Sequence, residues 1–210
     1  MQEIMELNEL IKNHCRTNKI RLIDAYPEFA DGAGRLKKEY SYGDGGHLNG
    51  AGYKRLGELI AIRVADLLAH ENTIACLGDS ITEGYPYSIL PLRGAEVFRP
   101  YPDHLRVEGV TVVNLGVAGD TALDMLERAR EIVPASMDAC IVMGGVNDLL
   151  IGRRVGSVLG TLADIYSTLE QADIAPFAMT VLPVRLLGLP FGQATASDLF
   201  EATRLRGPVR

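Results

Sequence analysis

The sequence predicts an α/β fold built on a five-stranded parallel sheet. Two observations predict it: short runs of apolar, β-forming residues recur along the chain, and segments with the apolar spacing of helices separate them. A third observation is that 47% of the 210 residues are hydrophobic, which is enough to bury a substantial core. We therefore expect one compact domain over residues 1–210.

Each predicted strand is a short apolar run between turn residues. The five runs lie at residues 20–23, 73–77, 111–115, 139–143 and 176–181. Apolar residues at helical spacing occur in three of the segments between the runs. They are Leu56, Leu59, Ile60, Val64 and Leu67; Leu123, Leu126, Ala129 and Ile132; and Val155, Val158, Leu162, Ile165, Tyr166 and Leu169. We expect these stripes to pack against the sheet and assign them no function.

Composition and charge limit the partners of the chain. The formal net charge is -6 and no Lys/Arg-rich run occurs, which argues against nucleic acid and anionic membranes. A neutral or cationic small molecule is the expected partner. No segment reaches membrane-spanning length, and the acidic N-terminus resembles neither a signal peptide nor an anchor. The cysteines Cys15, Cys76 and Cys140 lack metal-ligand spacing and fit reduced thiols in a cytoplasmic protein.

Chemistry is expected where strands meet helices, because open parallel sheets bind ligands at the carboxyl ends of their strands. The run at 73–77 leads directly into Gly78-Asp79-Ser80. A serine on such a tight turn can hold its hydroxyl outward, beside the next backbone N–H groups. The same residues fit a serine that only caps a helix, so both interpretations stay open.

Two further strand ends carry a glycine or an amide that can bind an oxyanion. After the run at 111–115, Gly119 precedes Asp120 and Thr121, and a glycine there lets a backbone N–H approach a ligand oxygen. After the run at 139–143, Asn147 precedes Asp148 and can donate from its amide. A tight turn with Asp120 or Thr121 as helix cap is the favoured explanation of the first segment taken alone, and turn and cap roles fit Asn147 and Asp148 as well.

The fourth element is an aspartate three residues before a histidine. Asp44 and His47 lie at the end of a glycine-rich stretch that begins near residue 26 and is long for a loop. The Asp44 carboxylate can turn onto the imidazole, fix its tautomer and stabilise its charged form. Asp44 can also be a simple turn residue, and the pair can be two metal ligands, although no third ligand of suitable spacing accompanies them.

Together the four elements resemble the sequence blocks of the SGNH hydrolases, also called the GDSL esterase and lipase family. The matching blocks are Gly78-Asp79-Ser80, Gly119, Gly144-x-x-Asn147-Asp148 and Asp44-x-x-His47. The resemblance extends roughly from residue 20 to residue 181. It implies a three-layer α/β/α sandwich of the flavodoxin-like type.

The resemblance also implies a role for each site residue. Ser80 would be the nucleophile, His47 the general base and Asp44 its orienting carboxylate. The Ser80 N–H, the Gly119 N–H and the Asn147 side chain would form the oxyanion hole. Gly116 in the same loop competes for the glycine role, but Gly119 is preferred because the family glycine immediately precedes an Asp-Thr pair.

The order of the blocks departs from the family. There the Asp-x-x-His block follows the other three near the C-terminus, whereas here Asp44 and His47 come first. We therefore expect a circular permutant, in which residues 1–70 are equivalent to the C-terminal part of the family and residues 73–210 to its N-terminal and central part. Alternatively, two chains exchange parts, so that His47 of one chain serves Ser80 of another.

The expected function is that of a serine hydrolase of short or medium acyl esters, with thioesters and lysophospholipids as related substrates and with no cofactor or metal. Six apolar residues after the run at 176–181 can line an acyl groove or belong to the core. They are Leu182, Pro183, Leu186, Leu187, Leu189 and Phe191. The alternative enzyme is a carbohydrate O-deacetylase, and the alternative of another class is a non-catalytic binding module or a permutant without activity. The oligomeric state is not set by the sequence.

Overall fold

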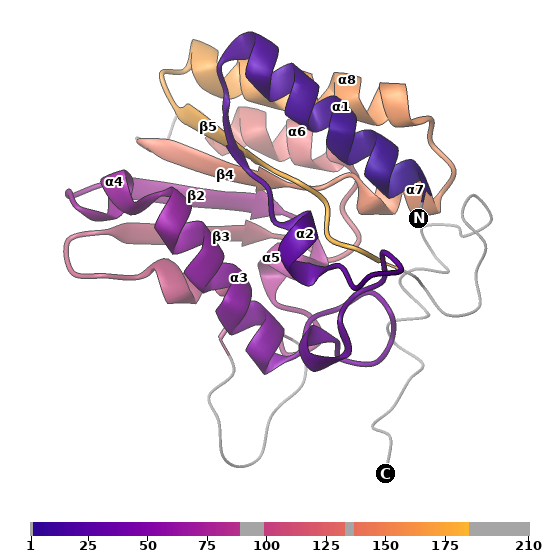
Figure 1. Cartoon of the computed structure of the whole chain (residues 1–210). Coiled ribbons are helices and arrows are strands. Elements are labelled where there is room, and N and C mark those ends of the chain that lie inside the picture. The colour runs from indigo at the N-terminus through magenta and orange to yellow at the C-terminus, as the bar shows by residue number, and fades with distance from the viewer. Residues whose placement is uncertain (1, 89–98, 133–136, 185–210) are drawn as a thin grey trace.

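The computed structural model describes residues 2–88, 99–132 and 137–184, and its strands form one sheet with helices on both sides (Figure 1). The strands are β1 (Arg21–Ile23), β2 (Thr73–Gly78), β3 (Thr111–Gly116), β4 (Ala139–Met143) and β5 (Ala175–Met179). Every neighbouring pair is parallel, so the predicted five-stranded parallel sheet is confirmed.

Helices alternate with these strands along the chain. The longer ones are α1 (Gln2–Asn18), α3 (Gly50–Arg63), α6 (Ala122–Ile132) and α8 (Val155–Gln171). The shorter ones are α2 (Tyr26–Phe29), α4 (Ala65–Leu68), α5 (Ser80–Glu83) and α7 (Val146–Leu150), with 3-10 turns η1 (Lys38–Tyr40) and η2 (Tyr101–Leu105). No helix in the described part of the chain is long and apolar enough to cross a membrane.

The sheet has the strand order β1-β5-β4-β2-β3. If β2 is counted first and β1 last, this order becomes 2-1-3-4-5, which is that of flavodoxin-like doubly wound sheets. The edge position of β1 beside β5 is therefore the position that the last strand takes in such a sheet. This topology supports the circular permutation, which stays a proposal.

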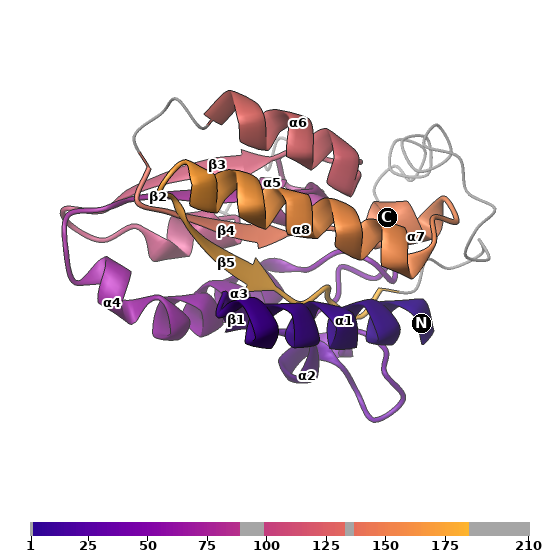
Figure 2. The ribbon, with the colours of Figure 1, turned by 90° about the horizontal axis from the view of Figure 1, so that it is seen from above.

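Two hydrophobic cores lie on opposite faces of the sheet, because successive strand side chains point to opposite sides. In β2, Ala75 and Leu77 belong to the core under α1, α6 and α8, whereas Ile74 and Cys76 belong to the core under α3 and η2. In Figure 2, which is seen from above, α1 and α8 run alongside each other. The three-layer α/β/α sandwich is thus confirmed.

The chain beyond β5 is fastened to two N-terminal elements. The Thr180 N–H donates to the carbonyl of Ile23 at 3.1 Å, and the Thr180 hydroxyl accepts from the N–H groups of Ala25 and Tyr26. The buried Asn8 side chain of α1 exchanges two hydrogen bonds with the Val181 backbone, at 2.9 and 2.7 Å. β5 ends at Met179, two residues before the predicted 176–181 run does, although the Thr180 N–H still bonds to β1.

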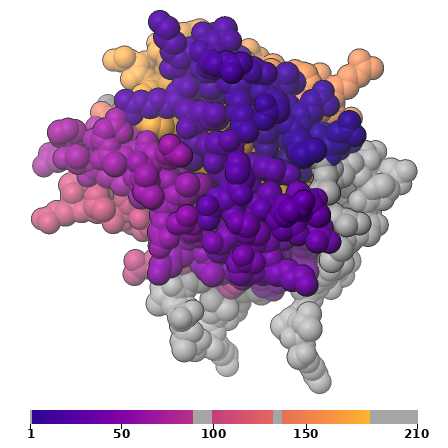
Figure 3. Space-filling view, in the orientation of Figure 1, coloured from indigo at the N-terminus to yellow at the C-terminus, as the bar shows by residue number. Residues whose placement is uncertain are grey.

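Much of one face of the molecule is built from the N-terminal elements. In the space-filling view, residues of α1 through α3 cover the side turned to the viewer in Figure 1 (Figure 3). Their buried side chains include Leu7 of α1 and Leu56 of α3, each fully buried. Since these two helices cover opposite faces of the sheet, the N-terminal segment contributes to both cores.

Candidate active site

Ser80 lies at the turn between β2 and α5. The cap of this short helix is Asp79, whose Oδ1 accepts the N–H of Ile81 at 3.0 Å. The alternative in which Ser80 itself caps the helix is therefore wrong. The Ser80 hydroxyl lies at the carboxyl end of β2, where the ligand crevice of a parallel sheet forms.

The loop that carries Asp44 and His47 is closed by its own hydrogen bonds. The Tyr42 N–H donates to the His47 carbonyl at 2.9 Å. Asn49 caps α3 by accepting the N–H of Gly52 at 2.9 Å, and its amide donates to the carbonyl of Ser41 at 3.2 Å. The loop is thereby anchored to the start of α3, which faces the turn at Ser80.

The structure brings Asp44, His47 and Ser80 into one hydrogen-bonded chain. His47 Nε2 lies 3.1 Å from Ser80 Oγ, and His47 Nδ1 lies 2.6 Å from Asp44 Oδ2. The other oxygen of Asp44 accepts the N–H groups of Gly46 and His47, at 2.9 and 2.8 Å. This is the geometry in which a serine hydroxyl can pass its proton to an oriented imidazole.

Asp44 is held in its charged form. Burial alone would raise the pKa of its carboxyl, but the hydrogen bond and charge of His47, with the two backbone N–H donors, outweigh burial and lower this pKa to about 2. An ionised Asp44 accepts a hydrogen bond from the N–H at Nδ1 of His47. Nε2 then has no proton and can accept the hydrogen bond of the Ser80 hydroxyl. Among the described residues, no group of three His, Cys, Asp or Glu side chains gathers as metal ligands would.

An aromatic side chain that the sequence analysis missed covers the imidazole. The ring centroid of Tyr85 lies 4.5 Å from that of His47. The Tyr53 hydroxyl of α3 donates to the Tyr85 carbonyl at 2.7 Å, which fixes the segment after α5 against the helix. Nothing in the local sequence marks Tyr85, because its contact depends on where the loop before α3 places His47.

The two candidate glycines after β3 have different surroundings. A Cβ on Gly116 would lie 2.0 Å from the Glu83 backbone nitrogen, so this glycine permits the close packing of β3 on α5. Gly119 has a φ of +90° and open space where a Cβ would stand. The N–H groups of Ser80 and Gly119 donate to no other described residue, which leaves them free for a ligand oxygen.

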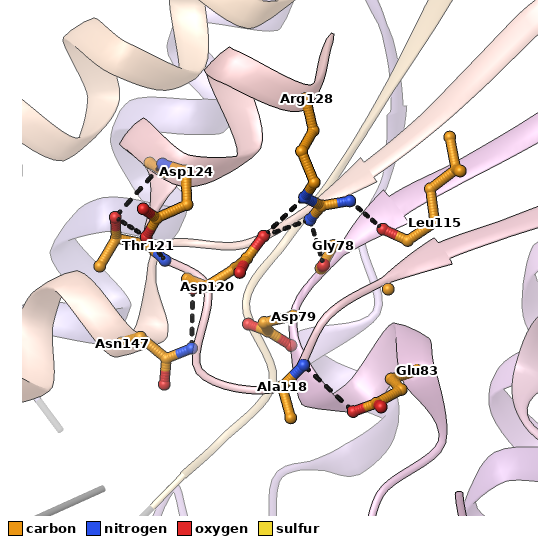
Figure 4. Close-up of polar contacts among 12 residues, drawn as sticks. Gly78, Asp79, Glu83, Leu115, Ala118, Asp120, Thr121, Asp124, Arg128 and Asn147 are labelled. Carbon is orange, nitrogen blue, oxygen red and sulfur yellow. Dashed lines mark hydrogen bonds and ion pairs between the residues drawn. The ribbon is translucent and has the colours of Figure 1, made fainter. Parts of the chain in front are cut away.

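Asn147 lies at the start of α7, close to the Gly119 loop. Its Nδ2 donates to the Asp120 carbonyl at 2.8 Å (Figure 4). The next residue, Asp148, is fully buried and accepts the Ala122 N–H at 2.7 Å. Both side chains thus fasten the loop that contains Gly119.

The six apolar residues after β5 divide into two groups. Leu182 is buried in the core beneath α3, and Pro183 is also buried, so neither lines an open groove. The remaining four, Leu186, Leu187, Leu189 and Phe191, lie outside the described residues.

The fold and the contacts together define an α/β protein with a serine, histidine and aspartate site at the carboxyl ends of its parallel strands. Residues 76–205 match the GDSL-like Lipase/Acylhydrolase family, and this match spans more than half of the chain. The chain therefore belongs to that family, as its sequence blocks predict. The matched residues include Ser80, Gly119 and Asn147, whereas Asp44 and His47 precede them.

Several solved structures are similar to parts of this chain. The SGNH-hydrolase family esterase AlinE4 is 25% identical over 52% of this chain and 58% of its own, with a TM-score of 0.43. The esterase EstA from Pseudoalteromonas sp. is 18% identical over 63% and 69%, with a TM-score of 0.43. A lipase/acylhydrolase from Enterococcus faecalis is 21% identical over 63% and 68%, with a TM-score of 0.38. The chain thus spans little more than half the length of AlinE4. No protein with curated annotation matches it.

Proposed function

We propose that this protein is a carboxylic ester hydrolase that works through an acyl-enzyme on Ser80. The observation that carries the proposal is the continuous chain of hydrogen bonds from Asp44 through His47 to Ser80. Membership of the GDSL-like family supports it. His47 is the general base in this proposal, and Asp44 orients it.

The first half of the reaction forms the acyl-enzyme. His47 Nε2 takes the proton of Ser80 Oγ while the oxygen attacks the ester carbonyl carbon, and a tetrahedral oxyanion forms. The bond to the alcohol oxygen then breaks, and His47 returns its proton to the departing alcohol. In the second half, water gives a proton to His47 as its oxygen attacks the acyl carbon. The bond between the acyl carbon and Ser80 Oγ then breaks, His47 returns the proton to Ser80 Oγ, and the acid leaves.

Three donors serve the oxyanion in this proposal. They are the N–H groups of Ser80 and Gly119 and the amide of Asn147. An asparagine amide has two hydrogens, and Asn147 uses one on the Asp120 carbonyl, which leaves the other for the substrate. No cofactor takes part in these steps.

The proposed substrates are esters of short or medium acyl chains, with thioesters and lysophospholipids in the same chemical class. Three exposed apolar side chains support an apolar substrate portion, because they belong to the segments that carry the site. They are Tyr42, Val117 and Leu123, each at least 42% exposed. A carbohydrate deacetylase needs a polar surround for its sugar hydroxyls, and these side chains do not supply one.

We also propose that residues 1–70 correspond to the C-terminal part of the family and residues 73–210 to the rest, within a single domain. The strand order and the family match, which begins after Asp44 and His47, support this arrangement. A cytoplasmic location is part of the same proposal. It rests on Cys15, Cys76 and Cys140, which are buried and unpaired.

The test is hydrolysis of p-nitrophenyl esters of increasing acyl length by the wild type, by Ser80→Ala and by the control Ser88→Ala, an exposed serine just past α5. Circular dichroism verifies that all three are folded. We expect Ser80→Ala to lose activity by a factor on the order of 10⁶, to the background, and Ser88→Ala to retain it.

The length series then separates the substrates. A preference for butyrate or longer chains supports an acyl esterase, whereas activity restricted to acetate favours a deacetylase. An inactive wild type, or a Ser80→Ala variant as active as the wild type, would contradict the proposal and favour a binding module or a disabled permutant.

A further inference from the structure

The strands that deliver Ser80 and Gly119 are joined at their carboxyl ends by one side chain of α6. Arg128 Nη1 donates to the carbonyl of Leu115 in β3, and Nη2 donates to the carbonyl of Gly78 in β2 at 3.1 Å (Figure 4). Gly78 lies two residues before Ser80, and Leu115 lies four residues before Gly119. The guanidinium thus bridges the two backbones that lead into the proposed oxyanion hole.

The same guanidinium also holds the loop of Gly119 itself. Arg128 Nε donates to the carboxylate of Asp120 at 2.8 Å, and Nη2 forms an ion pair with the same oxygen. Asp120 follows Gly119 directly, and its carbonyl accepts from Asn147. Arg128 therefore binds a group close to each proposed oxyanion donor. Gly78 lies two residues before Ser80, Asp120 lies directly after Gly119, and Asn147 donates to the Asp120 carbonyl.

Acidic side chains surround this loop. Glu83 accepts the N–H of Ala118 at 3.1 Å, and Asp79 lies within the turn before Ser80. Burial raises the pKa of the Asp120 carboxyl, and the hydrogen bond and charge of Arg128 oppose that rise. Negative charge beside an oxyanion opposes its formation. The positive charge of Arg128, paired with Asp120, therefore favours the reaction in addition to holding the loop in place.

We propose that Arg128 is a positioning residue that preorganises the oxyanion hole. It fixes the end of β2, the end of β3 and the Asp120 side chain relative to one another, so that the donors of Ser80, Gly119 and Asn147 converge. Arginine suits this task because its planar fork presents five donors to several acceptors at once, whereas lysine offers a single ammonium. This inference rests on the proposed ester hydrolysis.

A purely structural role predicts a different result. If Arg128 only stabilises the fold, its loss lowers the unfolding midpoint, but the folded enzyme keeps its kcat. If Arg128 positions the oxyanion donors, kcat falls in fully folded protein while KM changes little, because those donors act in the transition state. The split between kcat and KM therefore separates the two roles.

The experiment compares Arg128→Met and Arg128→Lys with Arg130→Met, an exposed arginine on the same helix. Kinetics on p-nitrophenyl butyrate are measured at least 15 °C below each unfolding midpoint, a margin on the order of the width of a thermal transition. We expect Arg128→Met to lower kcat about a hundredfold with KM within about threefold, which is the effect of losing one oxyanion donor. Arg128→Lys should recover only part of that loss, and Arg130→Met should match the wild type.

A further variant, Asp120→Asn, leaves Arg128 in place together with its hydrogen bonds to the carbonyls of Gly78 and Leu115. We expect a loss in kcat of about tenfold, and no further loss when it is added to Arg128→Met, because both changes break the same link. A kcat of folded Arg128→Met within about threefold of the wild type, or additive losses, would overturn the inference. If the wild type is inactive, or Ser80→Ala is as active as the wild type, the proposed function itself fails.

Discussion

Two aspartates near Ser80 lie in opposite electrostatic environments: Asp44, which bonds to His47, and Asp79, which precedes Ser80. His47 and two backbone N–H groups outweigh burial at Asp44 and lower its pKa to about 2. At Asp79, complete burial dominates and, with the charges of Asp120 and Asp148, raises the pKa to about 6 against the N–H of Ile81 and the charge of His47. Asp44 is thus stabilised as an anion, whereas ionised Asp79 costs stability at neutral pH.

This difference predicts a pH-dependent effect of Asp79→Asn. A carboxyl whose pKa is higher in the folded than in the unfolded chain stabilises the fold fully below the unfolded value, near 3.8, and loses that contribution as pH rises through about 6. Asparagine does not titrate, and its oxygen can still accept the Ile81 N–H. We expect Asp79→Asn to be more stable than the wild type at pH 7 by on the order of 1–3 kcal/mol, with the difference vanishing toward pH 4.

Urea unfolding at pH 4, 5, 6 and 7 checks this expectation. Glu127→Gln, which removes an exposed carboxyl of α6, is the matched control and should show no such trend. If the free energies of unfolding of Asp79→Asn and the wild type differ by the same amount at every pH, ionisation of Asp79 does not destabilise the fold and the prediction is wrong.

The individual site residues differ in how far the sequence could predict them. Ser80, Asn147, Asp44 and His47 stand in short motifs, and a motif needs only neighbouring residues to be seen. Arg128 could not be found in this way, because the carbonyls that it binds lie 13 and 50 residues away along the chain. On an amphipathic helix such an arginine is indistinguishable from one that only faces solvent.

Helices and strands that are marked by their own residues could be predicted from the sequence, whereas those that depend on distant contacts or are very short could not. β2 and β4 are central strands buried on both faces, so their apolar runs are conspicuous, and the predicted starts agree with the structure. β5 ends where Thr180 and Val181 form hydrogen bonds to residues 154 or more positions away, which a local pattern does not reveal. The short helix α2 (Tyr26–Phe29) also escaped prediction, because four residues cannot display a helical period.

The attachment of α1 to the segment after β5 predicts a measurable contribution to stability. Asn8 is 3% exposed and satisfies both the N–H and the carbonyl of Val181. Asn8→Ala leaves these two buried groups without partners, so we expect a loss of about 2 kcal/mol and a fall in the unfolding midpoint of roughly 4–8 °C. Differential scanning calorimetry measures it, with Met5→Ala, an exposed position on the same helix, as the control. Equal midpoints for the two variants would show that this link is dispensable.

At the scale of the whole molecule, the candidate site combines two distant parts of the sequence. Asp44 and His47 come from the segment before β2, and Ser80, Gly119 and Asn147 come from β2 onward. Residues before β2 also supply the edge strand β1 and helices on both faces of the sheet. The site therefore depends on the closure of the complete sandwich.

The contact between His47 and Ser80 within one chain leads to a prediction about assembly. If each molecule builds its own site, a mixture of Ser80→Ala and His47→Ala stays inactive after joint unfolding in urea and refolding, because each chain lacks one essential group. If chains exchange their N-terminal parts, half of the dimers are mixed and each of these contains one site with both residues intact, so about a quarter of the wild-type activity returns.

Because the 3.1 Å contact between His47 Nε2 and Ser80 Oγ forms within a single chain, we expect no recovery of activity on p-nitrophenyl butyrate. Wild type refolded in the same way shows that the procedure yields active protein, and a recovered quarter would establish exchange between chains.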